Sequence, residues 1–202
     1  MAPDPDNQDT QSLARDARGG KAEKLGDLYS RVLPALYAWA KLRIRPEYRR
    51  VLSPEDLVQE VWLRAAEVFG SFDAAKVSFR SWIFTVAKNV LFEVQRKAFK
   101  QTRERTPEGS TSRHHALNDV PDEVTSLTQR VQRDEGVKLF LDRVAQLDED
   151  DRKTLIHCGL EELSLREAAE RLDITREAVA KRWQRLRERI REWRVPEGLV
   201  AG

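Results

Sequence analysis

The stretch that decides the fold is Leu163–Trp193, which reads LSLREAAERLDITREAVAKRWQRLRERIREW. Apolar residues recur at i, i+3, i+4 and i+7 within Leu165–Leu172, as on one face of a short helix. Ser164 precedes that run and Glu167 follows three residues later, which is the spacing of a capping box. Thr175 follows a short polar break and is placed to cap a second helix. The sequence therefore predicts two helices joined by a tight turn.

The second of these helices carries different chemistry on its two faces. Its apolar stripe consists of Val179, Trp183, Leu186, Ile190 and Trp193. The opposite face carries Arg176, Lys181, Arg182, Arg185 and Arg189. Between Thr175 and Arg194 there are eight Lys or Arg against three Glu, so this helix is strongly positive. A short helix, a tight turn and a longer basic helix is the layout of a helix-turn-helix, whose second helix enters the DNA major groove. A plain helical hairpin with a solvated charged face is the alternative, but capping, spacing and charge together favour DNA binding.

Composition limits the fold class and the kinds of site. The 202 residues suffice for one domain or two small ones, and nine Gly, eight Pro and no alternating apolar stretches predict an all-α fold. The net charge of +2 means that nucleic-acid binding must come from local patches. The single Cys158 excludes an internal disulfide and a cysteine-based zinc site. No apolar run approaches the ~18 residues of a membrane span. The N-terminus has acidic residues and no apolar core, so it does not resemble a secretory signal, and we expect a cytoplasmic protein. No nucleophile–base pair, metal-ligand spacing or phosphate loop appears, so we expect no enzymatic activity and no metal or cofactor.

The N-terminal half begins with a predicted disordered tail at 1–24. A helix is expected over Leu25–Arg45, where Pro34 favours a kink, and a polar loop over Pro46–Leu52. The next helix begins at Ser53-Pro54-Glu55-Asp56, which combines a cap, a proline at the first helical position and two acids near the positive end of the helix dipole.

A loop over Gly70–Val77 and a long helix over Ser78–Lys97 complete this half. The predicted core positions of the helix are Phe79, Ile83, Val86, Val90 and Val94. Off that stripe lie Arg80, Phe84, Lys88, Phe92, Gln95 and Arg96. Basic residues interleaved with aromatic ones are typical of a single-stranded nucleic-acid surface. Aromatic residues at helical spacing more often belong to a core, so the pattern alone leaves both interpretations open and favours the core.

A polar segment separates the two halves and is predicted to be a flexible linker at 99–129. Its His114-His115 pair lacks a nearby ligand set, so we expect no metal there. Helical spacing resumes in Leu127–Leu147. The acids Asp148–Asp151 are interpreted as cap and dipole partners of the next helix, and His157-Cys158 as a structural pair.

Three stretches together resemble a sigma factor, the promoter-recognition subunit of bacterial RNA polymerase. They are SPEDLVQEVWLRAAEVFGSFD at 53–73, SFRSWIFTVAKNVLFEVQRK at 78–97 and LSLREAAERLDITREAVAKRWQRLRERIRE at 163–192. The first two resemble region two and the third resembles region four of the compact extracytoplasmic-function group, which keeps only these regions. The resemblance implies two small helical domains, region two at 25–98 and region four at 130–195, followed by a short tail at 196–202.

The resemblance also implies a partner for each surface. The stretch that docks on the clamp coiled coil of the polymerase largest subunit is matched by Asp56, Leu57, Val58, Gln59 and Glu60. Minus-ten recognition, including capture of a flipped base, is matched by Phe72, Lys76, Arg80, Trp82, Lys88 and Asn89. The helix that reads the minus-thirty-five element is matched by Arg176, Glu177, Lys181, Arg182 and Arg185. The implied partners are core RNA polymerase and promoter DNA, with an anti-sigma factor left open by the sequence.

The chain departs from the family pattern at three places. Val77-Ser78 stands where the family often has Gly-Ser, and Glu161-Glu162-Leu163 where it commonly has a glycine-containing turn. Glu177 stands where small residues are usual, and either accepts from a cytosine amine or caps the helix. These departures leave the fold expectation intact and leave the promoter sequence open.

Rival functions explain less of the sequence. A self-sufficient helix-turn-helix regulator, dimeric on palindromic DNA, accounts for Leu163–Trp193 but gives the two N-terminal stretches no purpose. An anti-sigma-like interaction protein would not need the basic DNA-facing helix. The sequence therefore favours a two-domain adaptor that melts the minus-ten element through region two and fixes the upstream register through region four.

Overall fold

A computed structural model describes residues 22–50, 52–104, 120–193 and 195–200. The predicted tail up to residue 21 and the His114-His115 pair lie outside these ranges. The described part is helical and contains no strand, which confirms the all-α prediction. The N-terminal domain consists of α2 (Ala22–Arg43), α3 (Pro54–Val68), α4 (Phe79–Glu104) and α6 (Asp122–Arg133). The C-terminal domain consists of α7 (Glu135–Ala145), α8 (Glu149–Thr154), the π-helical turn η4 (Leu155–Leu160), α9 (Leu165–Leu172) and α10 (Arg176–Glu192).

The first two helices of the N-terminal domain begin and end close to where the sequence predicts. α2 extends on both sides of Pro34, and the expected loop after it contains a 3-10 turn, η2 (Pro46–Tyr48). Ser53 caps α3 in a capping box with Asp56, as the start signals predict. A second 3-10 turn, η3 (Phe69–Ser71), follows α3 and leads into the loop before α4.

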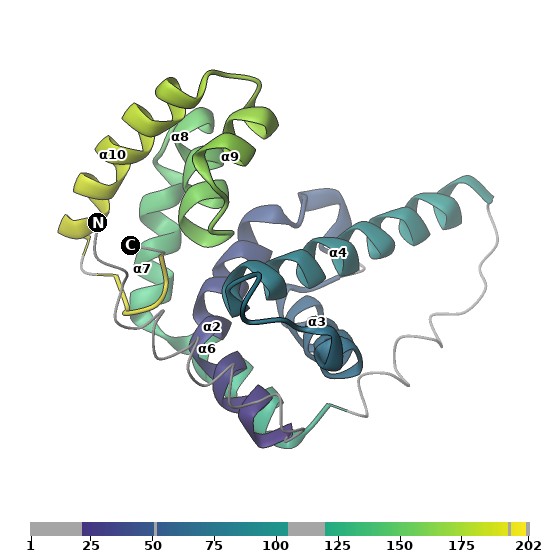
Figure 1. Cartoon of the computed structure of the whole chain (residues 1–202). Helices are drawn as coiled ribbons and strands as arrows, with labels where there is room; N and C mark the ends of the chain where they lie inside the picture. Colours follow the sequence, from purple (N-terminus) through teal and green to yellow (C-terminus); the bar gives the residue numbers. More distant parts are fainter. Residues whose placement is uncertain (1–21, 51, 105–119, 194, 201–202) are drawn as a thin grey trace.

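The predicted linker is shorter than expected, because helices occupy both of its ends. α4 continues to Glu104, and α6 begins at Asp122, within the segment 99–129 that composition assigned to a linker. α6 packs against α2 and α3, and Figure 1 shows it beside α2. Only Val124 and Thr128 of α6 are buried, four residues apart on one face. A buried stripe this narrow gives little hydrophobic periodicity, so the helix is not evident from the sequence of a polar segment.

The C-terminal domain differs from the predicted pattern at two points. The helical spacing in Leu127–Leu147 covers two helices, since Asp134 ends α6 and caps α7 by accepting from the Val137 amide at 2.9 Å. The segment predicted as a short tail folds back onto the protein, because Leu199 is fully buried in it. Gly198 allows this turn with a positive φ of 71°.

The two domains lie against each other. The turn η4 and helix α7 both contact α2, while the C-terminal half of α4 projects away from the rest of the chain (Figure 1). Within the described ranges, no helix is both long and apolar enough to cross a membrane.

Candidate nucleic-acid and polymerase interface

The helix-turn-helix is built by the local signals that predict it. Ser164 Oγ accepts from the Glu167 amide at 3.2 Å, and the Glu167 carboxylate accepts from the Ser164 amide at 2.9 Å. The Ser164 hydroxyl also donates to the Glu167 carboxylate at 2.7 Å, and this bond, together with the one from the Ser164 amide, lowers the pKa of the Glu167 carboxyl. Asp173 ends α9 in the left-handed conformation with a φ of 54°. Thr175 then caps α10 by accepting from the Ala178 amide at 3.2 Å. Caps at both ends of the turn therefore fix the angle at which α10 leaves α9.

The predicted apolar stripe of α10 is buried and its opposite face is exposed. The buried residues are Val179, Trp183, Leu186, Ile190 and Trp193. Of the residues matched to minus-thirty-five recognition, the solvent-exposed ones are Arg176, Glu177, Lys181 and Arg185. Cationic side chains on the N-terminal half of such a helix are placed to reach phosphates and base edges.

Arg182 is the exception on this face, because it is half-buried and paired within the domain. Its guanidinium lies 3.1 Å from Asp150 and 3.8 Å from Asp151, and Arg189 lies 3.3 Å from Asp151. Asp148 caps α8 by accepting from the Asp151 amide at 2.7 Å. The acids at the start of α8 thus serve as cap and as partners of α10, and no metal-binding cluster forms in the part of the chain that is described.

In α3, the structure divides the residues matched to polymerase docking into an inner and an outer set. Leu57 and Val58 are fully buried, and the Tyr29 hydroxyl donates to the Val58 carbonyl. These two side chains therefore pack inside the domain in this structure, and their part in docking stays a prediction. Asp56, Gln59 and Glu60 are half-buried and remain at the surface.

The aromatic residues of the loop before α4 are packed against one another. Phe72 is only 6 % exposed, and its ring centroid lies 6.0 Å from that of Phe69, 5.8 Å from Phe79 and 5.2 Å from Trp82. In this conformation the Phe72 ring is not open to a flipped base. Lys76 in the same loop has a side chain that is 83 % exposed, and its Nζ lies 3.5 Å from a carboxylate oxygen of Asp73.

Arg80, at the start of α4, binds the C-terminal domain and its C-terminal segment. Its Nε donates to the Leu160 carbonyl at 2.9 Å and its Nη2 to the Gly159 carbonyl at 3.2 Å. Its Nη1 and Nη2 donate to the carbonyls of Gly198 at 2.6 Å and Leu199 at 2.8 Å. All three guanidinium nitrogens are therefore engaged within the protein.

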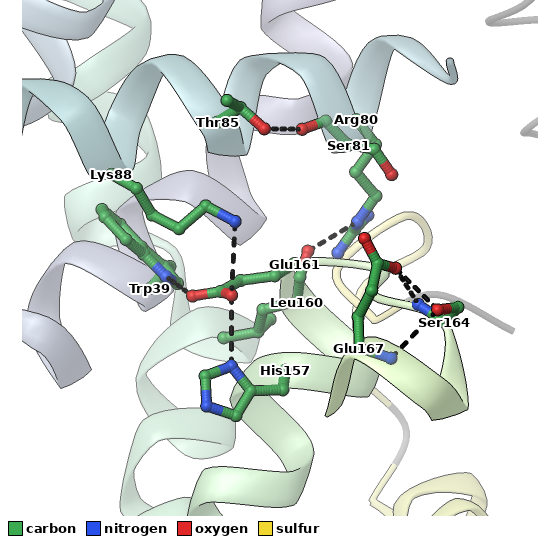
Figure 2. A network of polar contacts seen from close by, with 10 residues as sticks. All are labelled: Trp39, Arg80, Ser81, Thr85, Lys88, His157, Leu160, Glu161, Ser164 and Glu167. Carbon is green, nitrogen blue, oxygen red and sulfur yellow. Dashed lines mark hydrogen bonds and ion pairs between the residues drawn. The ribbon is translucent and has the colours of Figure 1, made fainter. Parts of the chain in front are cut away.

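Two turns further along α4, Lys88 faces a buried carboxylate of the C-terminal domain (Figure 2). Glu161 accepts a 2.8 Å bond from Trp39 Nε1, and its other oxygen lies 3.6 Å from Lys88 Nζ and 3.2 Å from His157 Nδ1. Burial alone would raise the pKa of Glu161, but hydrogen bonds from His157 and Trp39 and the charge of Lys88 lower it overall. Burial lowers the pKa of Lys88, against the opposing effect of Glu161. Asn89, next to Lys88, is exposed.

Sequence reasoning missed this contact between the domains, although one signal pointed to the turn that makes it. Glu162 adopts a φ of 55°, a conformation that favours glycine, at the place where the family commonly has a glycine-containing turn. Its carboxylate accepts a 2.6 Å bond from the Ser78 hydroxyl of the N-terminal domain. Phe84 was likewise placed off the core stripe of its helix, yet it is fully buried beside Trp39, with ring centroids 5.8 Å apart.

Family models match both halves of the chain. Sigma-70 region 2 matches residues 28–100, and Sigma-70, region 4 matches residues 138–190. The chain is 32 % identical over 143 residues to the ECF RNA polymerase sigma factor SigL of Mycobacterium tuberculosis, covering 69 % of this chain and 71 % of that protein. It is 29 % identical over 90 residues to the ECF RNA polymerase sigma factor BldN of Streptomyces coelicolor, a match that covers 45 % of this chain and spans only 33 % of BldN.

Among solved structures, the chain is similar to CnrH in its complex with the cytosolic domain of CnrY. The identity is 21 % and the TM-score 0.41, over 89 % of this chain and 92 % of that one.

Proposed function

This chain belongs to the ECF RNA polymerase sigma factors, and we propose that it binds core RNA polymerase and directs it to promoters by recognising and melting promoter DNA. The proposed partners are core polymerase and promoter DNA. The protein supplies binding and positioning, and polymerase supplies the catalysis.

The observation that carries this proposal is the exposed cationic face of α10 on a capped helix-turn-helix. Lys181 and Arg185 project away from the buried stripe, and Arg176 is exposed in the first turn of the helix. We propose that this face reads the minus-thirty-five element, with phosphate contacts that make binding salt-dependent and base contacts that discriminate by about 1–3 kcal/mol each. Glu177 is exposed on the same face and is our candidate acceptor for a cytosine amine.

The polymerase-docking surface proposed here is narrower than the family match. It consists of the surface residues Asp56, Gln59 and Glu60, which the buried Leu57 and Val58 hold in place from inside the domain. Replacing Gln59 or Glu60 by another polar residue should therefore weaken binding to core polymerase without unfolding α3.

Minus-ten recognition is proposed to use two kinds of residue. Lys76 and Asn89 are exposed and can contact DNA directly. Arg80 and Lys88 are engaged by the C-terminal domain, and Phe72 and Trp82 by the aromatic cluster, so these four need a rearrangement before they contact DNA.

The experiment that tests the function is transcription by purified core polymerase, with and without this protein, on a library of genomic fragments. New defined start sites that appear only with the protein are the expected result, and their alignment would give both promoter elements. No new start sites and no complex with core polymerase, together with tight binding of a dimer to palindromic DNA, would favour the self-sufficient regulator instead.

A further inference from the structure

Three arginines of α10 lie on the flank of the helix that borders α8. They are Arg182, Arg185 and Arg189, spaced at i, i+3 and i+7 so that they share one side of the helix. α8 packs against α10 within the same domain. Arg185 is exposed to solvent, whereas the Arg182 side chain is only 23 % exposed. The three arginines hold similar places in the helical pattern, and contact with α8 makes them different.

Two aspartates in the first turn of α8 engage the first and the last of these arginines. A carboxylate oxygen of Asp150 lies 3.1 Å from Nη2 of Arg182. Asp151 is shared between two arginines, because one of its oxygens lies 3.8 Å from Nε of Arg182 and the other 3.3 Å from Nη1 of Arg189. The Asp151 side chain is 17 % exposed, so it is enclosed between the two helices. Four charges of alternating sign therefore join α8 to α10.

A carboxylate and a DNA phosphate offer an arginine the same kind of contact. The planar guanidinium binds either group with charge-assisted hydrogen bonds to two oxygens. Sequence-independent binding to DNA depends on the number of phosphates that Lys and Arg neutralise. An arginine already paired with a carboxylate contributes less to that binding, because the ion pair must be broken first. Asp150 and Asp151 thus occupy Arg182 and Arg189 as phosphates would.

The local structure of α8 does not require that these two side chains reach α10. The helix is capped by Asp148, which accepts from the Asp151 backbone amide at 2.7 Å. Glu149 supplies an acid near the positive end of the helix dipole and pairs with Lys153 of the same helix at 2.6 Å. Ion pairs at a protein surface also add little net stability. The pairing of Asp150 with α10 therefore suggests a role in DNA binding in addition to a role in folding.

We propose that the two aspartates compete with DNA phosphates for Arg182 and Arg189, and thereby keep the sequence-independent affinity of α10 for DNA low. The exposed Arg176, Lys181 and Arg185 remain available to promoter DNA. Because a genome offers a very large excess of non-promoter sites, weak sequence-independent binding leaves the protein free to meet core polymerase. The inference rests on the proposed function, because the competition has a consequence only if α10 contacts DNA.

Binding of the full-length protein to a labelled duplex of arbitrary sequence tests the competition. Asp150→Asn keeps the shape of the side chain and removes the charge that faces Arg182. This variant should bind the duplex at least about threefold more tightly than the wild type, and Asp150→Asn combined with Asp151→Asn at least about tenfold. Fluorescence anisotropy at several salt concentrations measures the affinities. The double variant should also depend more steeply on salt, by about one phosphate contact or more.

Two control variants remove one negative charge each from other positions of the same domain. Glu149→Gln changes the same turn of α8, but Glu149 pairs within its own helix. Glu170 is exposed on α9 and pairs with Arg166 of the same helix at 3.1 Å, so Glu170→Gln is the second control. Both controls should bind the duplex within about twofold of the wild type, because salt screens distant charges. A gain for Glu149→Gln as large as that for Asp150→Asn would overturn the proposal.

A double-mutant cycle tests whether Asp150 acts through Arg182. In protein that already carries Arg182→Ala, Asp150→Asn should change the affinity for the duplex by less than about twofold, because the guanidinium that it would release is absent. A gain in this background as large as in the wild type would mean that Asp150 acts by general repulsion of DNA, and would overturn the proposal.

Transcription with core polymerase separates this inference from the proposed function. If the wild type directs new start sites while Asp150→Asn binds the duplex no more tightly than Glu149→Gln, the competition fails and the proposed function stands. If Asp150→Asn binds more tightly but neither it nor the wild type directs any start site, the competition is real and the proposed function fails.

Discussion

The two helices that we propose to contact DNA, α10 and α4, both carry basic residues but have very different surroundings. α10 buries one stripe and exposes most of its cations. α4 packs inside its own domain on one side, where Phe84 is buried beside Trp39 of α2, and it meets the C-terminal domain on another side, where Arg80 and Lys88 are engaged. Hydrophobic periodicity therefore assigns the faces of a helix that has one packing partner, and it fails where further partners cover the remaining faces.

The largest expected effect is a loss of stability, and it should differ between two phenylalanines of α4. Phe84→Ala should lower the free energy of unfolding by about 3–5 kcal/mol, because it removes a fully buried ring beside Trp39. Phe92→Ala should change it by less than about 0.5 kcal/mol, because Phe92 is 67 % exposed. Urea denaturation followed by circular dichroism measures both. Similar losses in the two variants would contradict the assignment of Phe84 to the core.

This pair of residues also shows how much of the fold the sequence could predict. The helix-turn-helix followed from capping signals and one apolar stripe, and both were confirmed because they are local. The same local signals placed Ser53 at the start of α3. Phe84 and Phe92 sit at equivalent places in the pattern, and only the fold distinguishes them.

The site was less predictable than the fold, because its decisive contacts join distant parts of the chain. Trp39 and Glu161 are 122 positions apart, and nothing near either residue indicates the other. In α3, the family match could not separate the buried Leu57 and Val58 from their surface neighbours. A buried Phe72 and a folded-back C-terminal segment likewise depend on packing that composition does not encode.

The second expected effect is a loss of affinity for promoter DNA, and it should differ between two arginines of α10. Arg185→Ala should weaken promoter binding about tenfold, or ~1.4 kcal/mol, because Arg185 is exposed on the side of α10 that we propose to face DNA. Arg182→Ala should weaken it less, since Asp150 and Asp151 already hold that guanidinium. Fluorescence anisotropy with labelled promoter DNA, at several salt concentrations, gives both affinities. A larger loss for Arg182 than for Arg185 would mean that DNA displaces the two aspartates.

Each domain has a capping box that begins with serine, so the stability lost with a helix cap can be compared between the two domains. Ser53→Ala and Ser164→Ala each remove the hydroxyl of a capping box, at the start of α3 and of α9. Each should lower stability by about 1 kcal/mol. Thermal unfolding measures the losses, with Ser71→Ala as a control because Ser71 donates to a carbonyl and caps neither helix. A loss at only one of the two caps would show that the domains do not unfold as one cooperative unit.

The smallest expected effect is a loss of stability at acidic pH, which arises from protonation of the buried Glu161 carboxylate between the domains. Hydrogen bonds from His157 and Trp39, with the charge of Lys88, outweigh burial and hold the pKa of Glu161 below its ordinary value of about 4.5. A carboxyl whose pKa is lower in the folded than in the unfolded protein stabilises the fold above the ordinary pKa, and this contribution disappears as the pH falls toward the lowered value. Between pH 6 and pH 3, wild-type stability should therefore fall more steeply than that of Glu161→Gln, as followed by urea midpoints at each pH. Glu170→Gln should keep the wild-type slope. If the slopes of the wild type and Glu161→Gln coincide, the Glu161 carboxylate contributes nothing to the contact between the domains, and the bonds of Arg80 and Ser78 hold the domains together instead.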